Sequence, residues 1–247
     1  MKNSRLSYPD LARIVGTGLI STGLGLLLFV FITIAWGDPF TRFTERQAQQ
    51  RLQKEFSASF GADDSAFLGV KLDPRLTRVA ARRHRRSLES GAVAARMRIP
   101  KLGMRKYVVK GADTADLDKG PGIYRETGFP GSGLPVAIAG HRTTHGAPFL
   151  NIDKLKAHDL IVLDMPYGRF QYEVTRTQII TPTDWSIIDI GAFEPNRRLR
   201  RQMLRTNTCA ETCEHLVLTA CHPKYSAKQR VAVFARLTDV SLRKAAK

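Results

Sequence analysis

The sequence predicts a mostly β domain, folded as a barrel, that follows a transmembrane helix and a basic spacer. Short β-branched or aromatic runs bounded by Gly, Pro and Asp fill the chain after residue 95, and they are typical of strands. One long apolar stretch lies near the N-terminus. At 247 residues the chain can hold one ordinary domain together with a membrane segment and a linker.

The apolar stretch runs from Ile14 to Gly37 and contains no charged residue. A helix of this length measures about 36 Å, against roughly 30 Å for the hydrocarbon core of a bilayer. Cleavage after Thr33-Ile34-Ala35 as a signal peptide is the alternative, but the stretch exceeds a usual signal-peptide core. We therefore expect a retained anchor, whose orientation the flanking Lys and Arg residues do not decide.

A spacer follows the anchor. Residues Thr41 to Phe56 suggest a short helical stalk, and the small residues from Ser57 to Ser65 suggest a break. The next segment is rich in arginine, and we expect a solvated or disordered tether there. A basic tether in a chain of net charge +17 favours binding to anionic lipid or to anionic wall polymer. The sequence contains no nucleic-acid-binding motif, so we expect no nucleic-acid partner. The arginines are Arg75, Arg78, Arg82, Arg83, Arg85 and Arg86.

Several strands and one hairpin can be placed in the β region. The hairpin joins 160–163 to 170–180 around Asp164–Gly168, where Pro166 and Gly168 suit a turn. Residues 196–205 could form one basic helical turn or a surface loop. The other expected strands cover 97–99, 107–109, 136–138, 215–221 and 229–237.

A cysteine ends one of the apolar runs. His215 to Cys221 is typical of a buried strand that delivers Cys221 to a sheet edge. The next run, Gln229 to Leu237, begins with Arg230 after a loop of five residues, 222–226, and a short connection. An antiparallel pairing of the two runs would bring the Arg230 guanidinium beside the Cys221 thiol.

From about Arg96 to Leu237 the chain resembles the sortases, which are cysteine transpeptidases of Gram-positive cell envelopes. The resemblance rests on Leu218-Thr219-Ala220-Cys221, on Arg230, and on the histidine region from Gly140 to Phe149, which is similar to actinobacterial class E members. Val217 and Ala220 stand where the family usually has threonine. The resemblance implies a closed sortase-like β-barrel with few short helices.

The resemblance also assigns roles. It implies Cys221 as nucleophile, His141 as general acid and base, and Arg230 as the group that stabilises an oxyanion. It suggests substrate-binding roles for Tyr124, Thr219, Ala220 and Trp185. The expected divisions are a cytoplasmic N-terminus at 1–13, a transmembrane anchor at 14–37, a stalk and basic linker at 38–94, a catalytic domain at 95–240, and a basic tail at 241–247.

The implied reaction cleaves a Leu-Ala-x-Thr-Gly or Leu-Pro-x-Thr-Gly sorting signal between Thr and Gly and joins the secreted protein to an amine of the cell-wall precursor. The acyl bond is conserved as a thioester, so we expect no cofactor and no metal. The catalytic domain is expected outside a single-pass membrane anchor, with a cytosolic domain as the alternative.

Other interpretations stay open at the level of sequence. Cys221 could be a small buried hydrophobe, and His145 a loop residue that shapes the cleft. His141 and His145 with Cys209 and Cys213 have spacings that allow a zinc site, although the two cysteines could instead form a disulfide. The alternative functions are a cysteine hydrolase on the same scaffold and a non-catalytic basic module that binds wall polymer.

Overall fold

The structure is a computed structural model that describes residues 8–36, 39–60, 67–71, 74–189, 198, 201–202 and 214–243. The chain divides into two compact units, Met1–Phe40 and Thr41–Lys247. Cys209, Cys213 and most of residues 196–205 lie outside the described part, so the disulfide, the zinc alternative that uses these cysteines, and the basic turn stay predictions.

Helix α1 (Tyr8–Trp36) makes up most of the first unit. Its segment Ala12–Phe31 has a mean hydropathy of 2.1 and is long and apolar enough to cross a membrane. A signal sequence near an N-terminus has the same composition, so the retained anchor and its orientation stay predictions.

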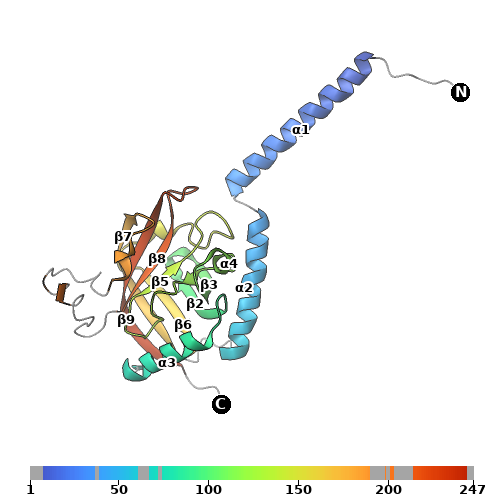
Figure 1. Cartoon of the computed structure of the whole chain (residues 1–247). Helices are drawn as coiled ribbons and strands as arrows, with labels where there is room; N and C mark the ends of the chain where they lie inside the picture. Colours follow the sequence, from blue (N-terminus) through green and yellow to red (C-terminus); the bar gives the residue numbers. More distant parts are fainter. Residues whose placement is uncertain are drawn as a thin grey trace. The chain divides into compact units, whose positions relative to one another are not determined.

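The second unit is built on a closed β-barrel (Figure 1). Strands pair in the order β9-β7-β6-β2-β3-β4-β5-β8, and β8 pairs with β9 to close the ring, while β1 adds to the free edge of β9. The expected fold class, a closed and mostly β barrel, is confirmed. The strands are β1 (Phe67–Lys71), β2 (Val93–Ile99), β3 (Met104–Lys110), β4 (Gly122–Ile123), β5 (Val136–Ala139), β6 (Leu160–Met165), β7 (Gly168–Ile180), β8 (His215–His222) and β9 (Gln229–Arg243).

The barrel interior is an apolar core to which the strands contribute alternate residues. On β8, for example, Leu216, Leu218 and Ala220 belong to this core, while Val217 faces a second apolar cluster outside the barrel. The expected hairpin is present, because β6 and β7 pair from Leu160↔Glu173 to Met165↔Gly168. Short helical segments connect the strands: η2 (Pro100–Leu102), α4 (Thr114–Leu117), η3 (Ile152–Lys154) and η4 (Trp185–Ile188).

Helix α2 (Pro39–Phe60) forms the expected stalk helix and packs on the barrel through the part that lies in the second unit. Leu52 and Phe56 are buried against a small cluster that includes Tyr107. The Gln49 side chain accepts from the backbone nitrogen of Tyr107 at 2.7 Å and donates to its carbonyl oxygen at 3.0 Å, as a neighbouring strand would. The helix is therefore part of the folded domain.

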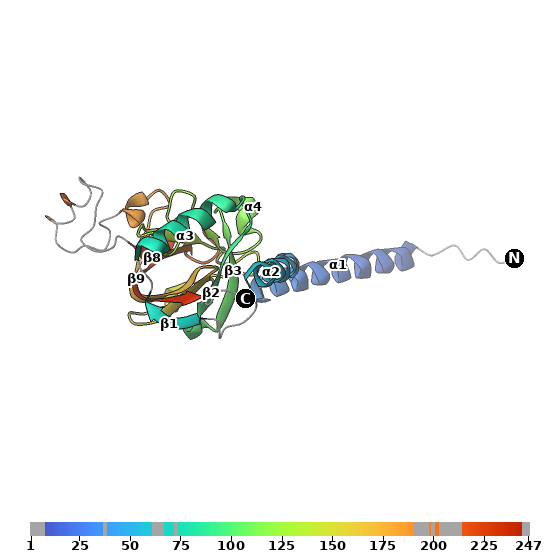
Figure 2. The same cartoon turned by 90° about the horizontal axis from the view of Figure 1, so that it is seen from below.

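The arginine-rich run is a folded helix, α3 (Pro74–Ser87), and not the solvated or disordered tether expected from the sequence. It lies across the end of the barrel (Figure 2). Thr77, Ala81 and His84 are buried on one face, at helical spacing, and His84 bonds the carbonyl oxygen of Ala94 at 3.0 Å. Because two of these three buried residues are polar and the third is alanine, the run shows no apolar periodicity in the sequence.

Candidate active site

Cys221 lies near the end of β8, directly opposite Arg230 of β9 in the antiparallel pair. Its thiol is free and partly exposed. Side chains alternate along the strand, so Thr219 and Cys221 share one face while Ala220, between them, is buried in the barrel core. The predicted register, with Cys221 opposite Arg230, is therefore present.

His141 follows the end of β5, the other neighbour of β8. The two strands are parallel, with Ala139 paired to Thr219, and the backbone nitrogen of Gly140 donates to the carbonyl oxygen of Thr219 at 3.1 Å. His141 and Cys221 each lie two residues beyond that last pair. Because parallel strands carry their ends to the same edge of a sheet, the imidazole and the thiol are delivered to one end of the barrel.

Two glycines fix the path of the loop that carries His141. A Cβ atom at Gly140 would lie 2.6 Å from the ring of Phe149, a buried residue, so any larger residue would clash. Gly146 has φ of +70°, and a Cβ atom there would lie 2.5 Å from a carboxylate oxygen of Glu45 in α2. The loop is thus held between the barrel core and α2.

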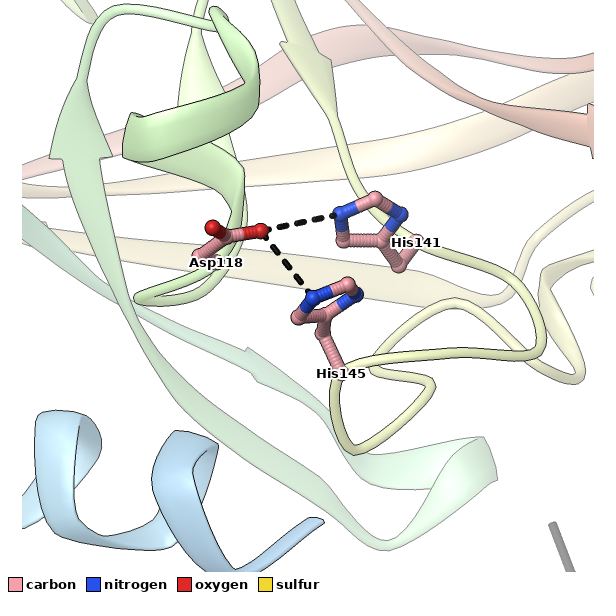
Figure 3. Close-up of side chains that lie close together, drawn as sticks. All are labelled: Asp118, His141 and His145. Carbon is pink, nitrogen blue, oxygen red and sulfur yellow. Dashed lines mark ion pairs between the residues drawn. The ribbon is translucent and has the colours of Figure 1, made fainter. Parts of the chain in front are cut away.

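Three titratable side chains lie together at this loop (Figure 3). The rings of His141 and His145 stack with their centroids 4.4 Å apart, and Asp118 Oδ1 lies 3.8 Å from His141 Nε2 and 3.1 Å from His145 Nε2. Burial lowers the pKa of His141, the charge of His145 lowers it further, and Asp118 opposes both effects. His141 therefore holds its proton less tightly than an exposed histidine.

The same three side chains offer ligand atoms within 4.8 Å of one another, a separation at which they could surround a metal ion. Their orientation fits a metal poorly, however. An imidazole nitrogen binds a metal in the plane of its ring, and the two rings are only 25° from parallel in a stack. Both Nε2 atoms nevertheless face the same oxygen of Asp118. The expectation of no metal stays a prediction.

Arg142 was not singled out by the sequence analysis, although its side chain is buried in the histidine loop, at 3% exposed. Its Nη1 donates to the carbonyl oxygen of Cys221 at 3.2 Å and to Nδ1 of His222 at 2.9 Å. Its Nη2 forms an ion pair with Asp153 of η3 at 2.7 Å. Arg142 therefore ties the histidine loop to the end of the cysteine strand.

Three of the four expected substrate-binding residues lie together. Tyr124, Thr219 and Trp185 line a small cavity of about 30 Å³ with Arg230. The hydroxyl groups of Tyr124 and Thr219 are hydrogen-bonded at 2.9 Å, and Trp185 meets Tyr124 edge to face at 6.0 Å. Ala220 does not lie with them, because its side chain points into the core. We call this cavity the tyrosine groove.

The chain matches known proteins over the barrel. The family model for the sortase domain matches residues 97–238. Sortase D of Bacillus subtilis is 30% identical over 135 residues, which are 55% of this chain and 57% of that protein. Sortase SrtE1 of Streptomyces coelicolor is 26% identical over 242 residues, which are 92% of this chain and 57% of that protein. The chain thus spans somewhat over half the length of both relatives.

Solved sortase structures resemble the barrel as well. The SrtF sortase of Corynebacterium diphtheriae superposes with a TM-score of 0.56 at 26% identity, over 65% of this chain and 92% of that one. Sortase E1 of Streptomyces coelicolor, solved with a tripeptide in its active site, gives 0.51 at 26% identity over 62% and 91%. The chain belongs to the sortase family, and the expected similarity to the actinobacterial class E type is confirmed.

Proposed function

We propose that the chain is a membrane-anchored cysteine transpeptidase whose catalytic residues are Cys221, His141 and Arg230. The observation that carries this proposal is the register of β8, which sets Cys221 opposite Arg230 and level with the loop that begins at His141. Membership of the sortase family supports the same reaction class.

In the first half-reaction the Cys221 thiolate attacks the carbonyl carbon of Thr in a sorting signal of the Leu-Ala-x-Thr-Gly or Leu-Pro-x-Thr-Gly type. A C–S bond forms, the Thr–Gly C–N bond breaks, and the His141 imidazolium gives its proton to the departing amine. The product is a thioester on Cys221 with His141 neutral.

In the second half-reaction an amine of the cell-wall precursor attacks the thioester. The C–S bond breaks, a new amide bond forms, His141 takes the proton of the amine, and the thiolate is restored.

Both half-reactions pass through a tetrahedral oxyanion. Arg230 Nη1 donates to the carbonyl oxygens of Ala227 and Gln229, and a guanidinium has five N–H donors, so others remain for the oxyanion.

The side chains that line the tyrosine groove are proposed to contact the signal peptide when it binds beside Cys221. Tyr124 and Trp185 present aromatic walls, and Thr219 lies on the same strand face as the thiol. A tyrosine hydroxyl that is already bound to Thr219 shapes the wall that meets the second residue of the signal. Tyr124→Phe should therefore change the ratio of kcat/KM for peptides with Ala and with Pro at that position.

The domain is proposed to lie outside the cell, anchored by α1, with secreted proteins that bear a C-terminal sorting signal as donors. Helix α1 is long enough to span a bilayer, and large domains cross membranes largely regardless of charge. A protease-protection assay on intact cells and on permeabilised cells would test the orientation.

The test of the activity uses the full chain in neutral detergent, a quenched signal peptide and an amine acceptor. We expect an amide product that depends on the acceptor and disappears in Cys221→Ala and His141→Ala. Cleavage that yields only the free acid would indicate a hydrolase. The absence of any Cys221-dependent turnover over a panel of signal peptides would instead favour a binding module.

A further inference from the structure

A second, larger cavity of about 440 Å³ lies between α3, the end of β3 and the segment after β4. Its charged wall consists of five basic side chains, and Tyr124 and Phe129 supply the apolar part. Among the lining residues that the structure describes, none is acidic. We call this cavity the basic pocket. Its cations are Arg82, Arg85, Arg86, Lys110 and Arg125.

Four of these cations, Arg82, Arg85, Arg86 and Lys110, form no ion pair with a carboxylate in the described part of the chain. Arg125 forms an ion pair with Asp113 at 2.6 Å and approaches Asp116 at 3.5 Å, so its charge is balanced. The exposed Arg82 and Arg86 have no such partner among the described residues. They are four residues apart on α3, where like charges face each other and repel. An anion held between them would remove that repulsion.

The remaining cations fix the walls of the pocket. Lys110 Nζ donates to the carbonyl oxygens of Arg85, at 2.9 Å, and Leu88, at 2.5 Å, where α3 ends. Arg85 Nη2 donates to the carbonyl oxygen of Arg125 at 2.6 Å. These bonds join α3 to β3 and to the segment after β4. The pocket is therefore formed before any ligand enters.

The chemistry of the wall favours phosphate over a single carboxylate. Guanidinium groups match phosphate oxygens with two parallel hydrogen bonds, and a phosphate monoester carries a charge of about −1.5 to −2 at pH 7. Several positive charges in one open cavity therefore fit a multivalent oxyanion. The aromatic floor from Tyr124 and Phe129 can meet an apolar or sugar-like part of the same molecule.

Tyr124 connects this pocket to the chemistry, because it lines both the basic pocket and the tyrosine groove. A molecule in the basic pocket is therefore separated from the tyrosine groove, which Arg230 also lines, by the Tyr124 residue that the two cavities share. Of the two substrates in the proposed reaction, the signal peptide has no phosphate, which leaves the amine acceptor as the candidate source of the anion. We propose that the basic pocket binds a phosphate or diphosphate group of the molecule that carries the acceptor amine; this assignment of the anion rests on the proposed function.

The test measures binding directly, with inorganic pyrophosphate as the probe. The full chain in neutral-lipid nanodiscs is titrated by calorimetry, as wild type and as Arg82→Ala/Arg86→Ala, Arg82→Lys/Arg86→Lys and Arg83→Ala. Arg83 is the matched control, since it lies on the same helix and is exposed but does not line the pocket. Circular dichroism of each variant checks that α3 and the barrel remain folded.

We expect saturable binding to the wild type and to Arg83→Ala. Each lost charged contact is expected to weaken binding about 10-fold, so the double alanine variant should bind about 100-fold more weakly. The affinity of the double lysine variant should lie between those of the wild type and the double alanine variant. Lysine keeps the positive charge but cannot form the two parallel hydrogen bonds of a guanidinium. Equal weakening in Arg83→Ala, or no saturable binding to the wild type, would overturn the proposal.

A competition arm identifies the source of the phosphate. A polyprenyl diphosphate is placed in the nanodisc during the pyrophosphate titration. Displacement of pyrophosphate indicates a lipid-linked acceptor, and failure to displace it indicates a soluble phosphate compound. Either outcome is consistent with phosphate binding in the basic pocket. The titration needs no turnover, so it can succeed or fail whether or not the chain performs transpeptidation. The two proposals are thus tested separately.

Discussion

Cys221 and Arg230 are direct partners across the antiparallel β8–β9 pair. Residues opposite each other in such a pair have Cβ atoms about 4.5–5.5 Å apart, so the guanidinium can reach the carbonyl oxygen of an acyl group on the thiol. Arg230→Ala should lower kcat about 10²- to 10³-fold with little change in the unfolding midpoint, because removing one oxyanion donor has this effect in other enzymes. Arg230→Lys should recover part of the rate. An unchanged kcat in Arg230→Ala would remove Arg230 from the mechanism.

Arg142 is expected to act as a positioning residue. Its bonds to the carbonyl oxygen of Cys221 and to His222 join the two strand ends that carry the thiol and the imidazole. Arg142→Ala should lower kcat at least about 10-fold and KM for the peptide should change little. Asp153→Asn, which weakens only the half-exposed ion pair of the same guanidinium, is the control and should retain most of the rate. Equal loss in both variants would point to folding alone.

The pKa of His141 should respond in opposite directions to its two neighbours. Asp118→Asn removes a negative charge that favours the imidazolium, so the pKa should fall further below 6.5. His145→Gln removes the positive charge that opposes it, so the pKa should rise. Titration of the His141 ring proton by NMR measures both shifts. If the His141 imidazolium is the reactive form, the alkaline limb of the kcat/KM profile should move with the His141 pKa. Shifts of the His141 pKa with the same sign in both variants would contradict the opposing effects of Asp118 and His145.

Asp164 anchors a network of three arginines on the outer face of the barrel sheet, since its neighbours Leu163 and Met165 point into the core. It is fully buried; burial raises its pKa, but hydrogen bonds from Arg169 and Arg96 and the charge of Arg98 outweigh that effect and hold the pKa below its ordinary value. The stability that this carboxylate contributes is therefore fully present above about pH 5 and is lost as the pH falls below its unfolded-state pKa of about 3.9.

Asp164→Asn should lower the free energy of unfolding at pH 7 by about 3–5 kcal/mol, because it leaves the largely buried guanidinium of Arg96 without its partner. The free energy of unfolding of Asp164→Asn should also fall less steeply than that of the wild type on acidification from pH 5 to pH 3. Urea unfolding at several pH values measures both effects. Parallel pH curves for the two proteins would show that Asp164 is not the titrating group.

The strands and the Cys221–Arg230 pair could be predicted because their signals are local. Apolar runs with turn residues between them define β8 and β9, and the short connection enforces their antiparallel register. The stalk helix and the apolar α1 likewise carry their signal in their own residues. The roles of Tyr124, Thr219 and Trp185 came from family resemblance, and the structure brings these three together.

The features that the sequence analysis missed depend on partners that are distant in the chain. Asp118 contacts His141 and His145 only because the fold places the end of α4 beside the histidine loop. Arg142 bonds the carbonyl oxygen of Cys221 only because the same loop lies beside the end of β8. Helix α3 was misjudged because its buried face contains no large apolar residue. The side chain of Ala220 points into the barrel core because side chains alternate along β8. The side chains of Ala220 and Cys221 therefore lie on different faces of the strand.

The central claim is that Cys221 carries the acyl group. The full chain should be incubated with signal peptide but without an amine acceptor, quenched in acid, digested and analysed by mass spectrometry. The account predicts a mass increase equal to the peptide up to its Thr, located on Cys221, sensitive to hydroxylamine and discharged on adding the acceptor amine. Peptide cleavage with no adduct on Cys221, or an adduct that persists in Cys221→Ala, would contradict it.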